Sequence, residues 1–203
     1  MSVNLQKGQK VDLTKGNAGL SRVMVGLGWD EAEKKGGLFG LFADSEDIDC
    51  DAIAFMLDGN GKLGDRRDIV FFNNLKHPSG SVIHQGDNLT GEGEGDDEQI
   101  LIDLAKVPQN YERIVIMVSI YKAEERRQHF GKIKNAFIRL VDNSNGKELC
   151  IYNLSSENFD GMNSMVFGEL YRRGGEWKFS AVGEPLKAWR ISDLAARYGY
   201  IMR

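Results

Sequence analysis

Two short stretches of the chain concentrate carboxylate side chains. Residues 30–51 carry eight acids and residues 87–98 carry six, and the only Lys or Arg residues in these windows are Lys34 and Lys35. The rest of the chain holds 16 acids against 24 Lys and Arg, although the net charge is only -4. Charges packed this densely repel one another unless water or a cation neutralises them. The two stretches are therefore either solvated loops or parts of a cation site.

The second stretch has the composition of a site for a hard cation. From Gly86 to Glu98, side chains that carry oxygen alternate with glycines. Calcium takes six to eight oxygen ligands, and glycines let the backbone curl around the ion. The stretch has no Cys or His, and His77, His84 and His129 have no ligand spacing, so zinc and softer metals are poorly served. The pattern predicts calcium or magnesium, and calcium tolerates an irregular cage better.

The first stretch leads directly into an apolar strand. Asp47, Asp49 and Asp51 alternate, so in an extended chain they point to one side and could face an ion shared with the second stretch. They could instead form a charged strand edge that discourages aggregation. The stretch is not an EF-hand loop, because Ala52 stands where such a loop requires glycine.

The elements that must position these acids are predicted to be strands. Apolar residues alternate with polar ones in runs of five to nine, bounded by Gly, Asn, Asp and Pro. So many short strands favour an all-β fold, a two-sheet β-sandwich, in a single domain over 1–203. The predicted strands are Val3–Leu13, Ser21–Gly28, Ala52–Leu57, Asp68–Phe72, Ser81–His84, Gln99–Leu104, Arg113–Tyr121, Asn135–Val141, Leu149–Leu154, Ser164–Tyr171 and Trp177–Val182.

Helical signals are few. Glu124–Phe130 is compatible with a short helix, and Ser192 is the expected N-cap of a C-terminal helix. No apolar run is long enough to cross a bilayer, and the N-terminus lacks the pattern of a signal peptide. Cys50 and Cys150 lie 100 positions apart and match no metal or redox spacing. These features predict a cytoplasmic protein.

Signals for catalysis and for nucleic-acid binding are weak. Gly26-Leu27-Gly28-Trp29 follows a predicted strand but lacks the third glycine of a dinucleotide loop. There is no strand-turn-helix nucleophile elbow, and a carboxylate that binds a cation is a poor proton donor near neutral pH. The bases of residues 122–139 are accompanied by few aromatic side chains, so they fit a solvated surface better than a nucleic-acid site. We expect neither an enzyme nor a nucleic-acid partner.

Taken together, the motifs resemble the TerD family of tellurium-resistance and stress-response proteins. The resemblance rests on Gly26–Asp30, on Asp47–Asp49 before an apolar strand, on the Gly/Asp/Glu string of Gly86–Glu98 and on Val107-Pro108. It extends from Val3 to about Tyr198. The segment Glu33–Phe42 departs from the family pattern and resembles an inserted, mobile loop.

The resemblance implies a β-sandwich that binds calcium, with one or two ions per chain, in a cytoplasmic bacterial protein associated with tellurite and chemical stress. The residues expected to ligate the metal are Asp30, Asp47, Asp49, Asp87, Asn88, Thr90, Gly91, Glu92, Gly93, Asp96, Asp97 and Glu98.

Two functional hypotheses follow. In the first, the protein is a calcium-dependent binding or scaffold module, and its partners are other stress or tellurium-resistance proteins, with the inner face of the membrane as one place to meet them. In the second, calcium bridges the acidic segments to a small phosphate ligand such as a cyclic nucleotide, for binding or for catalysis.

Overall fold

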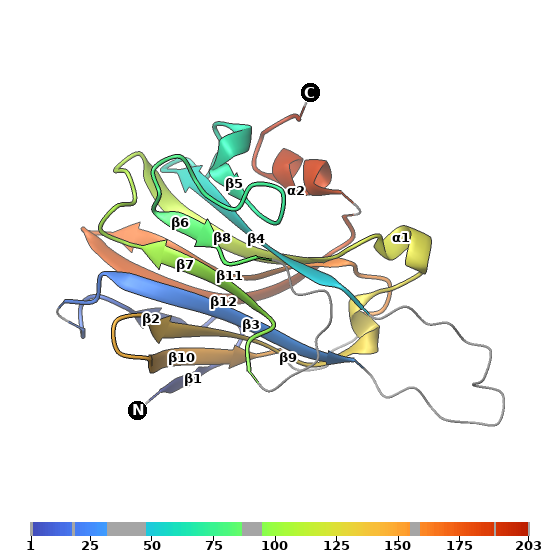
Figure 1. Ribbon diagram of the computed structural model, residues 1–203, viewed down its shortest axis with the longest axis horizontal. Helices are drawn as coiled ribbons and strands as arrows, with labels where there is room; N and C mark the ends of the chain where they lie inside the picture. Colours follow the sequence, from blue (N-terminus) through green and yellow to red (C-terminus); the bar gives the residue numbers. More distant parts are fainter. Residues whose placement is uncertain are drawn as a thin grey trace.

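Two β-sheets pack face to face in the computed structural model (Figure 1), which describes residues 2–17, 19–31, 48–86, 95–154, 159–188 and 190–202. In spatial order, the first sheet (sheet A) contains β1 (Val3–Leu5), β10 (Lys147–Asn153), β9 (Ile133–Asp142), β3 (Arg22–Glu31), β7 (Glu98–Asp103) and β6 (Val82–His84). The second (sheet B) contains β2 (Lys10–Asp12), β12 (Glu176–Leu186), β11 (Ser164–Arg173), β8 (Tyr111–Ile120), β4 (Cys50–Asp58) and β5 (Ile69–Val70). Neighbouring strands are antiparallel except β1 and β10. The predicted all-β sandwich is confirmed.

The main core lies between the two sheets. Alternate residues of each long strand point into it, such as Val23, Val25 and Leu27 of β3, while the residues between them face outward. Strand β4 differs, because it is buried on both of its faces. Its Cys50 and Ala52 belong to the core between the sheets.

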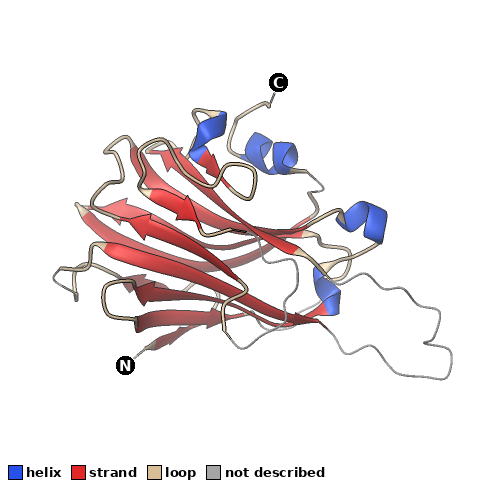
Figure 2. Ribbon diagram, in the orientation of Figure 1, coloured by secondary structure: helices blue, strands red, loops and turns tan. Residues whose placement is uncertain are grey.

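A second apolar layer covers part of the outer face of sheet B. Ile53, Phe55 and Leu57 of β4 point into it, and helix α2 (Ile191–Arg197) covers them with Leu194 and Ala195. Figure 2 shows α2 as the helix over this sheet near the C-terminus. The continuous apolar run of β4 is therefore explained by burial on both sides.

Some predicted strand boundaries were wrong. Val3–Leu13 is two strands in different sheets, because Gly8 adopts a positive φ of 82° and the chain turns from β1 into β2. Asp68–Phe72 contributes only the short β5, since Asp68 ends a 3-10 turn, η2 (Arg66–Asp68), and its side chain caps that turn. Strand β3 continues past the predicted end at Gly28 to Glu31.

Both predicted helices are present near the predicted positions, but their bounds and caps differ from the prediction. Helix α1 covers only Ala123–Arg126 and ends at Arg127, whose φ is 53°, before a 3-10 turn, η3 (Phe130–Lys132). The C-terminal helix is confirmed, but Ser192 is not its cap. Helix α2 starts two residues earlier than predicted, with Arg190 at the N-cap position, where the Arg190 N–H donates to Asp193 Oδ2 at 3.2 Å. Within the described ranges, no helix has the length and apolar character to span a bilayer.

Candidate metal site

The fold brings acids from three segments to one end of the sandwich. Asp30 is the penultimate residue of strand β3 there, β4 starts there after Asp49, and β7 starts there with Glu98. The acidic end is defined here as Asp30, Asp49, Asp51, Asp96, Asp97 and Glu98. Direct contacts tie these segments together: the Ala52 N–H donates to Glu98 Oε2 at 2.5 Å across the two sheets. The described acids of the two stretches are far apart in the sequence, and the fold brings them to the same end of the sandwich.

Asp97 lies among other carboxylates, and few protein groups neutralise its charge. Its Oδ2 accepts the Trp29 N–H at 2.8 Å, and its own N–H donates to Leu27 O at 2.8 Å. Burial raises the pKa of Asp97, the Trp29 hydrogen bond opposes that shift, and the negative charges of Asp30 and Asp96 add to it. The ionised form of Asp97 is thus disfavoured by its surroundings, and a bound cation would reverse this.

The pKa of Cys50, a core residue, is also raised by the charges of these carboxylates. The thiol is fully buried, and burial is the main cause that raises its pKa well above the usual value. The charges of Asp49, Asp51, Glu98 and Asp97 raise the pKa further, in that order. Four carboxylates therefore act on one thiol, which stays protonated and is unsuited to bind metal.

Asp96 differs from its neighbour Asp97, because Arg139 on β9 neutralises it. Arg139 Nε and Nη2 donate to the two oxygens of Asp96 at 2.7 and 3.0 Å, and the Asp96 side chain is fully buried. Gly26 makes room for this pair, since a Cβ atom at Gly26 would overlap the carboxylate. The glycine motif Gly26-Leu27-Gly28 is therefore the middle of strand β3 rather than a phosphate loop.

Glu98 points into the sandwich. It is 2% exposed, and besides the Ala52 N–H its Oε2 lies 3.4 Å from His84 Nε2. The Gly86 N–H donates to His84 Nδ1, so Nε2 carries the ring proton and faces Glu98. This carboxylate joins β4 of sheet B to β6 and β7 of sheet A.

Asp30 occupies the outer rim of the acidic end. Its side chain is exposed, and Oδ2 accepts a hydrogen bond from Asn135 Nδ2 at 2.7 Å. Asn135 adopts a left-handed backbone conformation with φ of 52°. The pairing of β3 with β9 shifts between Gly28 and Asp30, which gives this strand end an irregular geometry.

The described acids fit a hard cation but do not complete a site. Within the ranges described above, no group of three or more His, Cys, Asp or Glu is close enough to hold a metal ion. Of the predicted ligands, the structure describes Asp30, Asp49, Asp96, Asp97 and Glu98. The other predicted ligands lie outside the described residues, as does the insertion Glu33–Phe42; they are Asp47, Asp87, Asn88, Thr90, Gly91, Glu92 and Gly93. Carboxylate oxygens without histidine or thiolate are the donor set that calcium and magnesium prefer.

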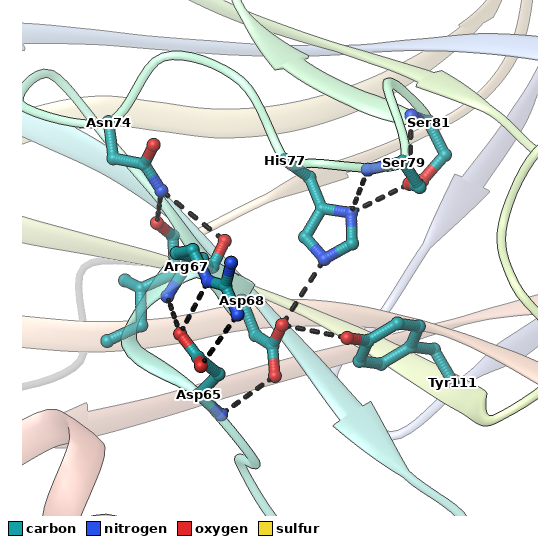
Figure 3. Close-up of polar contacts among 9 residues, drawn as sticks. Asp65, Arg67, Asp68, Asn74, His77, Ser79, Ser81 and Tyr111 are labelled. Atoms are coloured by element: carbon teal, nitrogen blue, oxygen red, sulfur yellow. Dashed lines mark hydrogen bonds and ion pairs between the residues drawn. The ribbon is translucent and has the colours of Figure 1, made fainter.

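A second carboxylate centre lies at the far end of β4 and β8, and the sequence did not predict it (Figure 3). Asp68 Oδ1 accepts the Tyr111 hydroxyl at 2.7 Å and lies 3.3 Å from His77 Nε2, and Oδ2 accepts the Asp65 N–H at 2.9 Å. The Asp68 and His77 side chains are buried. Tyr111 lies 43 positions from Asp68 in the sequence, so only the Asp65-to-Asp68 capping spacing could have indicated the centre.

The Asp68 centre also contains a carboxylate, an imidazole and a hydroxyl in series, the order used for nucleophilic catalysis. Ser79 Oγ lies 2.7 Å from His77 Nδ1, and the Ser79 N–H donates to the same nitrogen. Ser79 Oγ also accepts the Ser81 N–H at 3.2 Å. The contacts of Ser79 with His77 and Ser81 belong to a local turn. We therefore interpret the centre as a structural one, which holds the loop between η2 and β6 in place.

Known proteins match this chain over almost its whole length. The model of the TerD domain matches residues 1–198. The "stress response protein SCP2" of Bacillus subtilis is 52% identical over 200 residues, which cover 98% of this chain and 100% of that protein. The "tellurium resistance protein TerD" of Serratia marcescens is 45% identical over 199 residues, with 98% of each chain covered.

Among solved structures, a homologue of a telluride resistance protein (TerD) from Streptomyces coelicolor shares the fold. Its TM-score is 0.63 at 20% identity, and the match covers 85% of this chain and 94% of that one.

Proposed function

The chain belongs to the TerD family, and we propose that it is a calcium-binding protein of the bacterial stress and tellurite response, without an enzymatic activity of its own. The relatives' names support the stress and tellurium part of this proposal. In this view the metal switches the acidic end between two states, and the end with its metal is a binding surface for other proteins of the cytoplasm.

One observation carries the calcium proposal. Asp49, Asp51, Asp97 and Glu98 come from two distant segments, and all four act electrostatically on the Cys50 thiol. Arg139 pairs with Asp96 and with Glu148, and His84 faces Glu98. A divalent cation would offset the negative charge that the four carboxylates bring to this end.

Asp97 and Asp49 are the described side chains placed best for a ligand role. Asp97 lies at the junction between β3 and the segment before β7, and Asp49 lies directly before β4, with Tyr121 N–H bound to its backbone carbonyl at 2.8 Å. Asp30 would close the site on the solvent side. The remaining oxygens would come from Asp47 and from 87–94. When bound, calcium would supply charge neutralisation and would hold these segments together.

Calorimetric titration of chelator-treated protein with calcium, repeated in excess magnesium, tests the proposal. We expect saturable binding that magnesium does not suppress. Asp97→Asn and Asp87→Ala should each weaken it by tenfold or more, which is about 1.4 kcal/mol. Glu124→Gln serves as the matched control, because Glu124 is an exposed acid on α1. No binding, or the same loss in Glu124→Gln, would refute a defined calcium site.

A further inference from the structure

Helix α2 leaves part of the outer face of sheet B uncovered. This part carries a trough lined by Lys and Arg side chains, called the cationic trough below. A hollow of about 400 Å³ is lined by Lys10, Tyr171, Arg173 and Lys178, and a neighbouring hollow of about 300 Å³ shares Lys10, Tyr171 and Arg173. Together they fall within the size range of small-ligand sites. The trough is defined here by these two hollows.

Strand register places Tyr171 at the centre of the trough. Lys178 on β12 and Arg113 on β8 are its direct neighbours on either side. Arg173 follows two residues along the same strand, and Lys10 Nζ lies 5.8 Å from the centre of the Tyr171 ring. Four cations from four strands therefore surround one aromatic ring.

Two of these cations are neutralised and two are not. Lys178 pairs with Asp12, and Arg113 lies 3.7 Å from Glu169. Lys10 and Arg173 form no ion pair among the described residues, although Glu176 on β12 lies opposite Arg173 on β11. Because the two hollows meet at Lys10 and Arg173, the unneutralised charge lies where a ligand would contact both.

We propose that this trough binds a small organic phosphate, with the phosphate group between Lys10 and Arg173 and the organic part over Tyr171 toward Arg113. Guanidinium groups form charge-assisted, often bidentate hydrogen bonds with phosphate oxygens, and lysine adds a point charge. Glu176 and Glu112 also line the hollows, so a long polyanion would meet repulsion that a compact phosphate avoids.

The trough is remote from the acidic end. Tyr171 pairs with Arg113, and Arg113 is seven residues along β8 from Ile120, which pairs with Cys50. At about 3.3 Å per residue the separation is about 23 Å. Phosphate binding in the trough therefore does not require calcium, which makes this proposal independent of the calcium proposal.

The test is calorimetric titration of the full chain, in the presence of chelator, with phenyl phosphate and with inorganic phosphate. We expect saturable binding, tighter for phenyl phosphate because its ring contacts Tyr171. Arg173→Gln and Lys10→Gln should each weaken phenyl phosphate binding by roughly tenfold, because each removes a charge-assisted contact. Both side chains are exposed at their tips, and circular dichroism checks that the variants fold.

Lys147→Gln is the matched control, since it removes one exposed charge from sheet A, away from the trough. It should leave binding unchanged. Equal weakening in Lys147→Gln would mean general charge attraction, and equal affinity for the two probes would refute an organic ligand. Binding that appears only with calcium would place the phosphate at the acidic end, and absence of saturable binding would overturn the proposal outright.

Discussion

At one end of strands β4 and β8 a single carboxylate, Asp68, meets donors from Asp65, His77 and Tyr111, whereas at the other end the charges of four carboxylates act on the Cys50 thiol. Hydrogen-bond donors meet both oxygens of Asp68, whereas at the acidic end neighbouring carboxylate charges raise the pKa of both Cys50 and Asp97. Buried carboxylates need partners, and one that lacks them costs stability. The difference fits a structural role for Asp68 and, under the calcium proposal, a ligand-binding role for the acidic end.

Removing Asp68 should have the largest effect on stability. Asp68→Ala leaves the buried His77 ring and the Tyr111 hydroxyl without their acceptor and removes the half of the η2 capping box in which Asp68 accepts the Asp65 N–H. We expect a loss of about 3–5 kcal/mol in the free energy of unfolding, measured by urea denaturation. Calcium affinity should not change, and a parallel loss of affinity would break the distinction between the two ends.

Gly26→Ala should disturb the neutralised part of the acidic end. A Cβ atom at this position overlaps the Asp96 carboxylate, so the bidentate pair with Arg139 must move. We expect a loss of about 1–3 kcal/mol in the same assay. Gly16→Ala is the control, because a Cβ atom there meets nothing within 4 Å. Equal effects of the two substitutions would show that Gly26 serves no such steric purpose.

Tyr111→Phe should cost less, about 1–2 kcal/mol, because it removes one hydrogen bond to Asp68. It should also change the response to alkali. Burial and the Asp68 hydrogen bond raise the pKa of Tyr111 to about 12, above the ordinary value of 10.0. The neutral phenol therefore stabilises the fold below pH 10, and this contribution is lost as the pH rises through 10 toward 12. The Phe variant should lack that part of the alkaline loss in a pH series of unfolding curves.

The smallest expected effect concerns the two thiols, which should not react with a thiol reagent in the folded protein. Burial raises the pKa of Cys50 well above its usual value and that of Cys150 to about 12, with the charge of Glu148 adding to the latter shift. We expect labelling by a disulfide reagent at pH 8 only after unfolding. Rapid labelling of the native protein would contradict the burial of these thiols.

The sequence predicted the sandwich because strand formation depends on local patterns, and period-two alternation identified most strands. The cation chemistry that the Gly/Asp/Glu string predicts stays a prediction. The sequence did not predict the pair between Arg139 and Asp96, because that pair depends on the room left by Gly26 on a neighbouring strand. It also merged β1 with β2, since one glycine turn separates two strands of similar pattern.

The Asp68 centre and the cationic trough were beyond local patterns for the same reason. His77 and Tyr111 become partners only when η2, the following loop and β8 are packed together. Lys10 and Arg173 are ordinary surface residues in the sequence, and only the order of β2, β12 and β11 places them around Tyr171. Both sites therefore depend on the packing of segments that are far apart in the sequence.

The calcium-induced shift in the thermal midpoint of unfolding tests the central contrast most directly. With calcium at 100 times its dissociation constant, the wild-type protein should gain about 2.7 kcal/mol, a midpoint increase of roughly 5–10 °C over the chelated state. Asp97→Asn should lose most of this increase, while Asp68→Ala, although less stable throughout, should keep it. An undiminished increase in Asp97→Asn, or no increase in the wild type, would contradict the assignment of the acidic end to calcium.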